Sequence, residues 1–81
     1  ATGSTAGSVV TVSGDGSRIH NSVCVNTGTG SSSQYTALTL TDASAFNCYV
    51  ETNGTKHDLT LAGSRALYIT RGQAVGCVVV S

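Results

Sequence analysis

Short runs of residues with high β-propensity alternate with turn signals through residues 45–80, and this alternation constrains the fold more than any other feature. The runs occupy residues 45–50, 56–61, 66–70 and 74–80. Segments that contain glycine, asparagine or serine separate them, and Asn53-Gly54 is the strongest hairpin signal in the chain. Short strands at nearly even spacing are typical of an all-β sandwich or barrel.

The first half continues the pattern, with strands expected at residues 9–12, 18–25 and 34–41. Asp15-Gly16 supplies the positive φ that a hairpin turn needs. Residues 26–33 have no apolar anchor and are expected to form an exposed loop. The sequence therefore predicts a single all-β domain, residues 9–81, built as a small antiparallel sandwich or barrel of about seven short strands without substantial helix.

Residues 1–8 are rich in Gly, Ser and Thr and predict a flexible N-terminal arm, either a floppy terminus or an arm that orders along a neighbouring subunit. In the strands, alternation assigns side chains to two faces. The inward set is Leu38, Leu40, Phe46, Cys48, Val50, Leu59, Leu61, Leu67, Ile69, Val75, Cys77 and Val79. In the earlier strand, Ile19, Val23 and Val25 share one face and His20, Ser22 and Cys24 share the other. Tyr35, Tyr49 and Tyr68 have the opposite parity, which predicts either a tyrosine-bearing contact face or a second, partly buried sheet face.

The core that this chain can build is small. It has 81 residues, no Trp or Met, and Phe46 as its one phenylalanine. Domains below about 80 residues usually need a staple, a metal or a partner chain. The formal net charge is zero, so self-repulsion between copies is weak. We therefore expect a homo-oligomer, such as a trimer, or a chain that docks onto a larger assembly.

The three cysteines, Cys24, Cys48 and Cys77, allow at most one intrachain disulfide. Cys48 and Cys77 share the inward parity and could pair if their strands are neighbours. The alternative is that all three are small buried hydrophobic residues.

No motif carries chemistry, so we expect a protein that is not an enzyme and has no cofactor, no metal site and no catalytic residue. His57 and Asp58 are adjacent in an expected strand, so their side chains point to opposite faces. No Cys-x-x-Cys is present, and the four basic residues are scattered, which argues against nucleic acid. No apolar run reaches the length of about 20 residues that a membrane span needs. No signal peptide is expected in the given residues, either because a leader has been removed or because there never was one.

The run from Asn53 to Val75 has a distinctive order: an Asn-Gly turn, the Leu59-Thr60-Leu61 strand, a Gly63 turn, and a short strand that leads to the final valines. In this order it resembles small β-rich modules of bacteriophage virions, such as capsid decoration (cement) proteins and tail-fibre modules. The resemblance implies a structural role and stability borrowed from neighbouring subunits, and it carries no functional residue over to this chain.

We therefore expect a structural virion component, foremost a self-associating capsid decoration protein that reinforces the shell. The expected interface residues are Thr2, Ser4, Thr5, Tyr35, Tyr49, Tyr68, Val78 and Val80. One alternative is a carbohydrate-binding or adhesive module, extracellular or on a cell surface, with the tyrosines against sugars. Another is a filament or pilus subunit joined by strand addition through residues 75–80.

Overall fold

The computed structural model describes residues 1–5, 7–28, 35–53 and 66–80. In these residues the protein is all-β, with eight strands in two sheets and no helix. The strands are β1 (Thr2–Gly3), β2 (Gly7–His20), β3 (Val23–Asn26), β4 (Tyr35–Phe46), β5 (Tyr49–Thr52), β6 (Leu67–Thr70), β7 (Gln73–Val75) and β8 (Val78–Val80). The first sheet has the order β1-β3-β5-β8; the second has the order β2-β4-β6, and β7 also pairs with β4.

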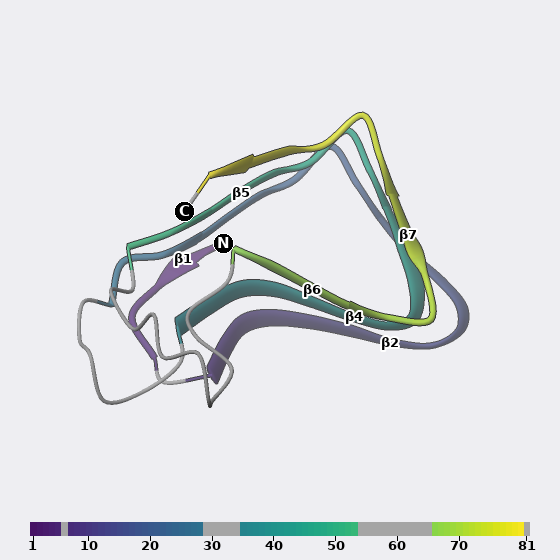
Figure 1. The fold of residues 1–81 in the computed structure, drawn as a ribbon, viewed down its shortest axis with the longest axis horizontal. Coiled ribbons are helices and arrows are strands. Elements are labelled where there is room, and N and C mark those ends of the chain that lie inside the picture. The colour runs from purple at the N-terminus through teal and green to yellow at the C-terminus, as the bar shows by residue number, and fades with distance from the viewer. Residues whose placement is uncertain (6, 29–34, 54–65, 81) are drawn as a thin grey trace, which may run out of the picture.

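The chain winds in coils that stack on one another. Every strand pair is parallel, and each strand lies beside the strand that holds the same place one coil later. β2 and β3 form the first coil, β4 and β5 the second, and β6, β7 and β8 the third. Figure 1 shows the coils nearly superimposed as a triangle, with β5 on one side, β6 on another and β7 on the third. The all-β prediction is confirmed, but the prediction of antiparallel strands is wrong.

The hairpin expected at Asp15-Gly16 is wrong, because this turn signal marks a bend within a coil. The hairpin expected at Asn53-Gly54 extends beyond the described residues and stays a prediction. Asp15-Gly16 does not reverse the chain: β2 runs from Gly7 to His20, and both of its halves pair in parallel with β4, with a register shift between Ser13 and Ser17. A glycine or asparagine with positive φ suits a bend as well as a hairpin, so the residue type does not distinguish the two.

The corners rest on residues with left-handed backbone at matching places in successive coils. Asn21, Asn47 and Gly76 have φ of 49°, 56° and 65° and lie between the strands of the second sheet and those of the first. Asp42 and Arg71, both with φ of 54°, make a second corner in the second and third coils. Asparagine and aspartate tolerate this region better than most residues, so the sequence can place a bend there at modest cost.

Facing residues in neighbouring coils are 26 to 29 positions apart in the sequence. This spacing is an internal repeat. Val10-Thr11-Val12-Ser13 lies against Leu38-Thr39-Leu40-Thr41, and that segment lies against Leu67-Tyr68-Ile69-Thr70. Each coil is thus one repeat unit, and repeats of this size bury a continuous core only when neighbours cover them.

The core runs along the inside of the stack, and the second coil supplies most of it. Leu38, Leu40 and Val50 are fully buried, as their predicted inward parity requires. Parity fails across a corner, because the bend rotates the side chains beyond it. Cys24 is therefore buried, whereas Val23, which has the same parity as Ile19, is exposed.

Three further predictions concern the N-terminal arm, the strand at residues 56–61 and the loop at residues 26–33. Residues 1–8 contain β1 and the start of β2, and the predicted mobility of this arm stays a prediction. The expected strand at residues 56–61 and most of the loop at residues 26–33 lie outside the described residues. Asn26, however, ends β3 and is fully buried, so the prediction that the exposed loop begins there is wrong.

Candidate functional site: the two ends of the stack

The third coil leaves inward-facing side chains uncovered. Cys24, Val50 and Val79 occupy one inward position in three successive coils. Their exposed fractions are 1%, 0% and 51%. Val79 sits over a fully buried valine, so its exposure comes from the lack of a described coil on its outer side. We call the outer surface of β6, β7 and β8 the C-terminal end face.

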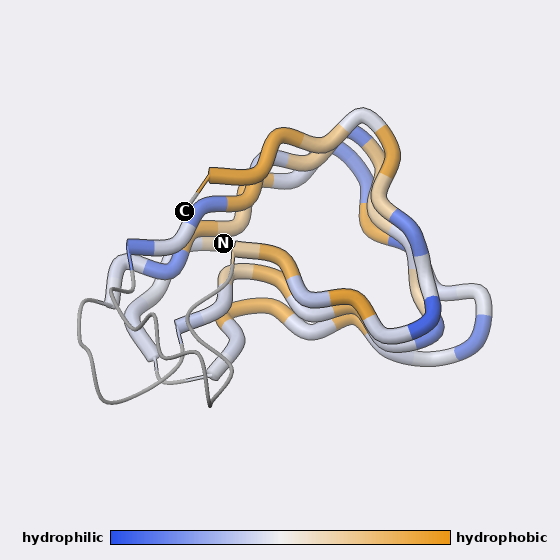
Figure 2. The backbone as a smooth tube through the Cα atoms, in the orientation of Figure 1, coloured by the Kyte–Doolittle hydropathy of each residue, from blue (hydrophilic) through white to orange (hydrophobic). Residues whose placement is uncertain are grey.

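The C-terminal end face is apolar, and in the described part of the chain nothing pairs with its outer strand edge. Val78 and Val80 flank Val79 and are exposed, as is Val75 at the end of β7. β8 pairs with β5 on one side and has no partner on the other among the described residues. Figure 2 shows the apolar colour running along β8 to the end of the drawn tube. Unpaired N–H and C=O groups beside exposed valines form a template for another strand.

The opposite end, the N-terminal end face, consists of the outer edges of β1 and β2. Here a short segment covers the first sheet: Thr2 pairs with Val25, and Gly3 pairs with Asn26. The Val25 N–H donates to the Ala1 carbonyl oxygen at 2.8 Å, and the Ala1 amino group donates to the Val23 carbonyl. β1 therefore takes the place on β3 that a preceding coil would take.

A buried amide ties this end together. Nδ2 of Asn26 donates to the carbonyl oxygens of Thr5, Gly7 and Thr36, at 3.0, 3.3 and 3.1 Å. Oδ1 of Asn26 accepts the Gly28 N–H at 3.0 Å. These partners belong to the N-terminal segment, the first coil, the second coil and the segment after β3. One side chain thus fixes the stacking of three successive parts of the chain, and burial makes each of its bonds costly to lose.

The corner between the second and third coils is tightly packed and carries an ion pair. A Cβ at Gly72 would lie 1.9 Å from the Ala43 carbonyl oxygen, so only glycine allows this approach. Nε and Nη2 of Arg71 donate to the two carboxylate oxygens of Asp42 at 2.6 and 3.0 Å. The hydrogen bond from Arg71 holds the pKa of Asp42 below its usual value, and the same bond holds the pKa of Arg71 above its own.

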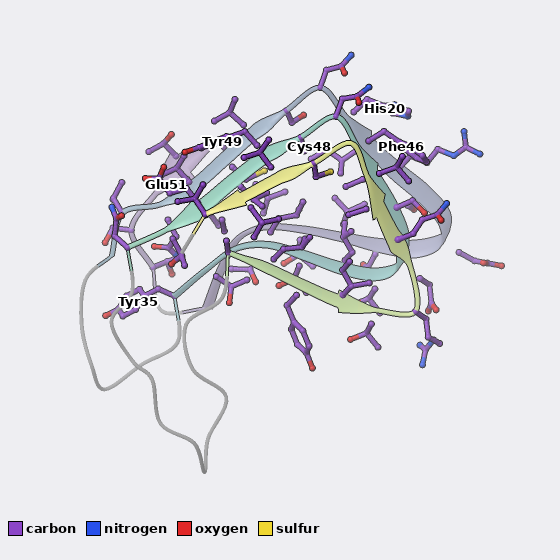
Figure 3. The ribbon with its side chains drawn as sticks, turned by 45° about the horizontal axis from the view of Figure 1, so that its top comes forward. His20, Tyr35, Phe46, Cys48, Tyr49 and Glu51 are labelled. Atoms are coloured by element: carbon purple, nitrogen blue, oxygen red, sulfur yellow. The ribbon has the colours of Figure 1, made fainter. Side chains whose placement is uncertain are left out.

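An aromatic pair lies outside the core, at the corner where Asn21 and Asn47 bend the chain. The rings of His20 and Phe46 stack with centroids 5.1 Å apart and planes 18° apart. The Arg18 guanidinium lies 5.9 Å from the Phe46 ring centre. Figure 3 shows both rings at the corner, far from Tyr35. Phe46 was predicted to face inward; the structure places its ring beside the outward His20, because Ala45 takes the inward position.

The tyrosines do not share one face. Tyr49 lies on β5 in the first sheet, whereas Tyr35 and Tyr68 lie on β4 and β6 in the second. The Tyr49 hydroxyl donates to Oε1 of Glu51 at 2.5 Å. That hydrogen bond, together with desolvation, raises the pKa of Tyr49. Of the two alternatives from parity, the single tyrosine-bearing contact face is therefore wrong, whereas the expectation that these tyrosines are interface residues stays a prediction.

The three cysteines are free thiols. Cys48 and Cys77 directly precede the paired residues Tyr49 and Val78, so they hold the same corner position in neighbouring coils. The condition for their pairing, neighbouring strands, is met, yet no disulfide joins them. Burial raises the pKa of the Cys24 thiol, which makes it a poor nucleophile.

Five of the predicted interface residues lie at the two ends of the stack. Thr2, Ser4 and Thr5 are exposed at the N-terminal end, and Val78 and Val80 are exposed at the C-terminal end. Sequence reasoning missed Asn26, which it placed in a loop, and it assigned Val79 to the interior. The internal repeat was the signal that could have placed both residues.

In the part of the chain that the structure describes there is no pocket and no cluster of three or more His, Cys, Asp or Glu residues that could hold a metal ion. The same residues include no helical segment long and apolar enough to cross a membrane. Comparison with known proteins finds no match among protein families, curated proteins or solved structures.

Proposed function

We propose that this chain is a structural module that self-associates by stacking coils end to end, and that it serves as a component of a virion. The observation that carries the proposal is the half-exposed Val79 above the fully buried Val50. An inward side chain left open at the end of a stack gains burial when another coil covers it. Complete burial of a valine side chain contributes about 1.5–3 kcal/mol.

Within the virion proposal, the parallel coils favour an elongated part, such as a tail-fibre module, over a flat decoration of the shell. Stacking adds length along one axis, at about 4.8 Å per coil. The filament alternative relies on the same end-to-end contact and differs in location alone. The sugar-binding alternative loses its main cue, because the three tyrosines lie in two different sheets.

The first experiment measures the native mass of the full chain over a wide range of concentrations, by sedimentation velocity, with electron microscopy for shape. We expect particles that lengthen with concentration at constant width. Val79→Lys places a charge on the C-terminal end face and should raise the concentration needed for assembly by about tenfold or more.

Thr41→Lys is the matched control. Thr41 lies on β4 in the second coil, with outward parity and a strand on each side, away from both ends of the stack. The Thr41→Lys substitution should leave assembly unchanged. A wild-type chain that stays monomeric at every soluble concentration would contradict the proposal. The virion assignment is tested separately, by looking for this chain in purified virus particles by mass spectrometry.

A further inference from the structure

The two ends of the stack do not finish at the same level. At the N-terminal end, β1 adds one extra level to the first sheet, below β3, whereas the second sheet begins with β2, in the same coil as β3. At the C-terminal end, both sheets finish on the third coil, with β8 in the first and β6 and β7 in the second. The N-terminal end face is therefore stepped and the C-terminal end face is level.

This step decides how two copies can join head to tail. If β1 of the next copy stayed in place on β8, the next copy's β2 would lie two strand spacings from β6 and β7. The second sheet would then have a gap of one strand, about 4.8 Å wide, between the copies. If β1 leaves, β2 lies directly on β6 and β7, and β3 lies directly on β8. Both sheets then continue without a gap.

We propose that β8 of one copy replaces β1 on β3 of the next copy, so that copies join head to tail through a parallel strand exchange. This inference rests on the proposed self-association and adds its polarity, its register and the strand that must be released. β1 is thereby a removable cover for the edge to which the neighbouring copy binds.

The register of the existing coils supports the exchange. β5 pairs with both β3 and β8, and Val23, Tyr49 and Val78 fall in one row. By the same register, Val78, Val79 and Val80 would face Val23, Cys24 and Val25 of the next copy. β1 pairs two residues with β3, whereas β8 presents a three-residue valine strand. At Val25, the one position that both strands cover, the exchange replaces Thr2 with Val80.

The second sheet is equally compatible with this register. Leu67 and Ile69 would meet Val10 and Val12 of the next copy, as Leu38 and Leu40 do within one copy. Ala74 would meet Ile19 of the next copy in the same way. All of these are inward positions packed on the core, so the apolar interior would continue across the junction.

Charge complementarity adds an independent argument. Asp42 lies in β4 between Thr41 and Ala43, which pair with Ser13 and Ser17, so it faces the segment that contains Asp15. Arg71 takes the place of Asp42 one coil later. In the head-to-tail junction Arg71 would therefore lie opposite Asp15 of the next copy, with unlike charges facing each other. The Arg71 side chain is 71% exposed and has room for this second carboxylate.

Two variants test the exchange by the concentration at which half of the copies are assembled. Deletion of residues 1–3 removes the competing strand and should lower that concentration by about tenfold. Asp15→Arg places like charges across the junction and should raise it several-fold, since an unfavourable pair between desolvated groups opposes contact. Asp15→Asn is the matched control for charge and should fall between Asp15→Arg and the wild type.

The outcomes separate this inference from the function on which it rests. If neither the wild type nor the deletion variant assembles, self-association itself is wrong. If the wild type assembles and the deletion weakens assembly, self-association stands, but β1 belongs to the interface and the exchange is wrong. If Asp15→Arg assembles as readily as the wild type, the junction does not bring Arg71 to Asp15, and head-to-tail stacking in this register is wrong.

Discussion

The two ends of the stack differ in how far the side chain at the same inward position is exposed. At the N-terminal end, Cys24 is buried, since β1 lies beside β3 and Asn26 binds the segment after β1. At the C-terminal end, Val79 is half exposed. A short segment with a strand of two residues therefore suffices to cover the first sheet at this end. Burial in this fold depends on what lies over a coil, more than on the apolar character of the residue.

The largest expected effect concerns the covered end. Asn26→Ala removes from a fully buried site an amide whose two N–H groups donate to three carbonyl oxygens and whose oxygen accepts one bond. Each buried polar group left without a partner costs about 1–3 kcal/mol, so we expect a loss of about 3 kcal/mol or more in the free energy of unfolding. Urea denaturation at low protein concentration, where copies are not assembled, measures it.

Thr52→Val is the comparison for Asn26→Ala. Thr52 holds the place of Asn26 one coil later, and its hydroxyl donates to the Tyr35 carbonyl oxygen at 2.5 Å. Valine keeps the shape and loses the hydroxyl, with an expected cost of about 1 kcal/mol. Equal costs at the two positions would show that Asn26 does not specially secure the N-terminal end.

The next prediction compares valine-to-alanine substitutions at Val50 and Val79, which face each other in the second and third coils. Val50→Ala empties a fully buried position in the second coil and should cost about 2–3 kcal/mol, the sum of lost burial and an added cavity. Val79→Ala, one coil higher, should cost less than about 1 kcal/mol in the unassembled protein, since half of this side chain already meets water. Similar losses for the two variants would mean that the C-terminal end is covered in the isolated chain.

How far the sequence predicts this molecule depends on the range over which its patterns hold. Within one strand the two-residue period is reliable, and Leu38 and Leu40 face inward as expected. The period fails at Asn21 and Asn47, where a left-handed residue bends the chain and resets the faces. Beyond the bend at Asn21, Val23 is exposed and Cys24 is buried, although Val23 has the same parity as Ile19, which packs on the core.

The parallel pairing of the strands was not predicted from the sequence for a related reason. Turn residues report local backbone geometry, and the same geometry serves a hairpin and a corner. The sequence does contain the long-range signal: Asn47-Cys48-Tyr49-Val50 and Gly76-Cys77-Val78-Val79 are the same corner and strand in successive coils. The end faces were predictable only in part, because Val79 has the pattern of a core residue and its exposure depends on whether another coil covers it.

The smallest expected effect is a pH dependence at the corner that joins the second and third coils. The pKa of Asp42 is lowered in the folded protein by its hydrogen bond with Arg71, from an ordinary value of 3.8. A lowered folded-state pKa stabilises the protein above the unfolded-state value, and the contribution disappears as the pH falls through the folded-state value. The pair is exposed, so the effect is small and weakens with added salt.

Asp42→Asn should therefore reduce the loss of stability between about pH 6 and about pH 3, measured as the shift of the urea midpoint at low ionic strength. Asparagine tolerates the left-handed backbone at this position, where φ is 54°, so the change isolates the charge. The same measurement at high salt, which screens the exposed pair, is the control and should remove the difference between the variant and the wild type. If Asp42→Asn and the wild type lose stability equally on acidification, the ion pair does not hold the third coil on the second, and apolar stacking alone supports the open end.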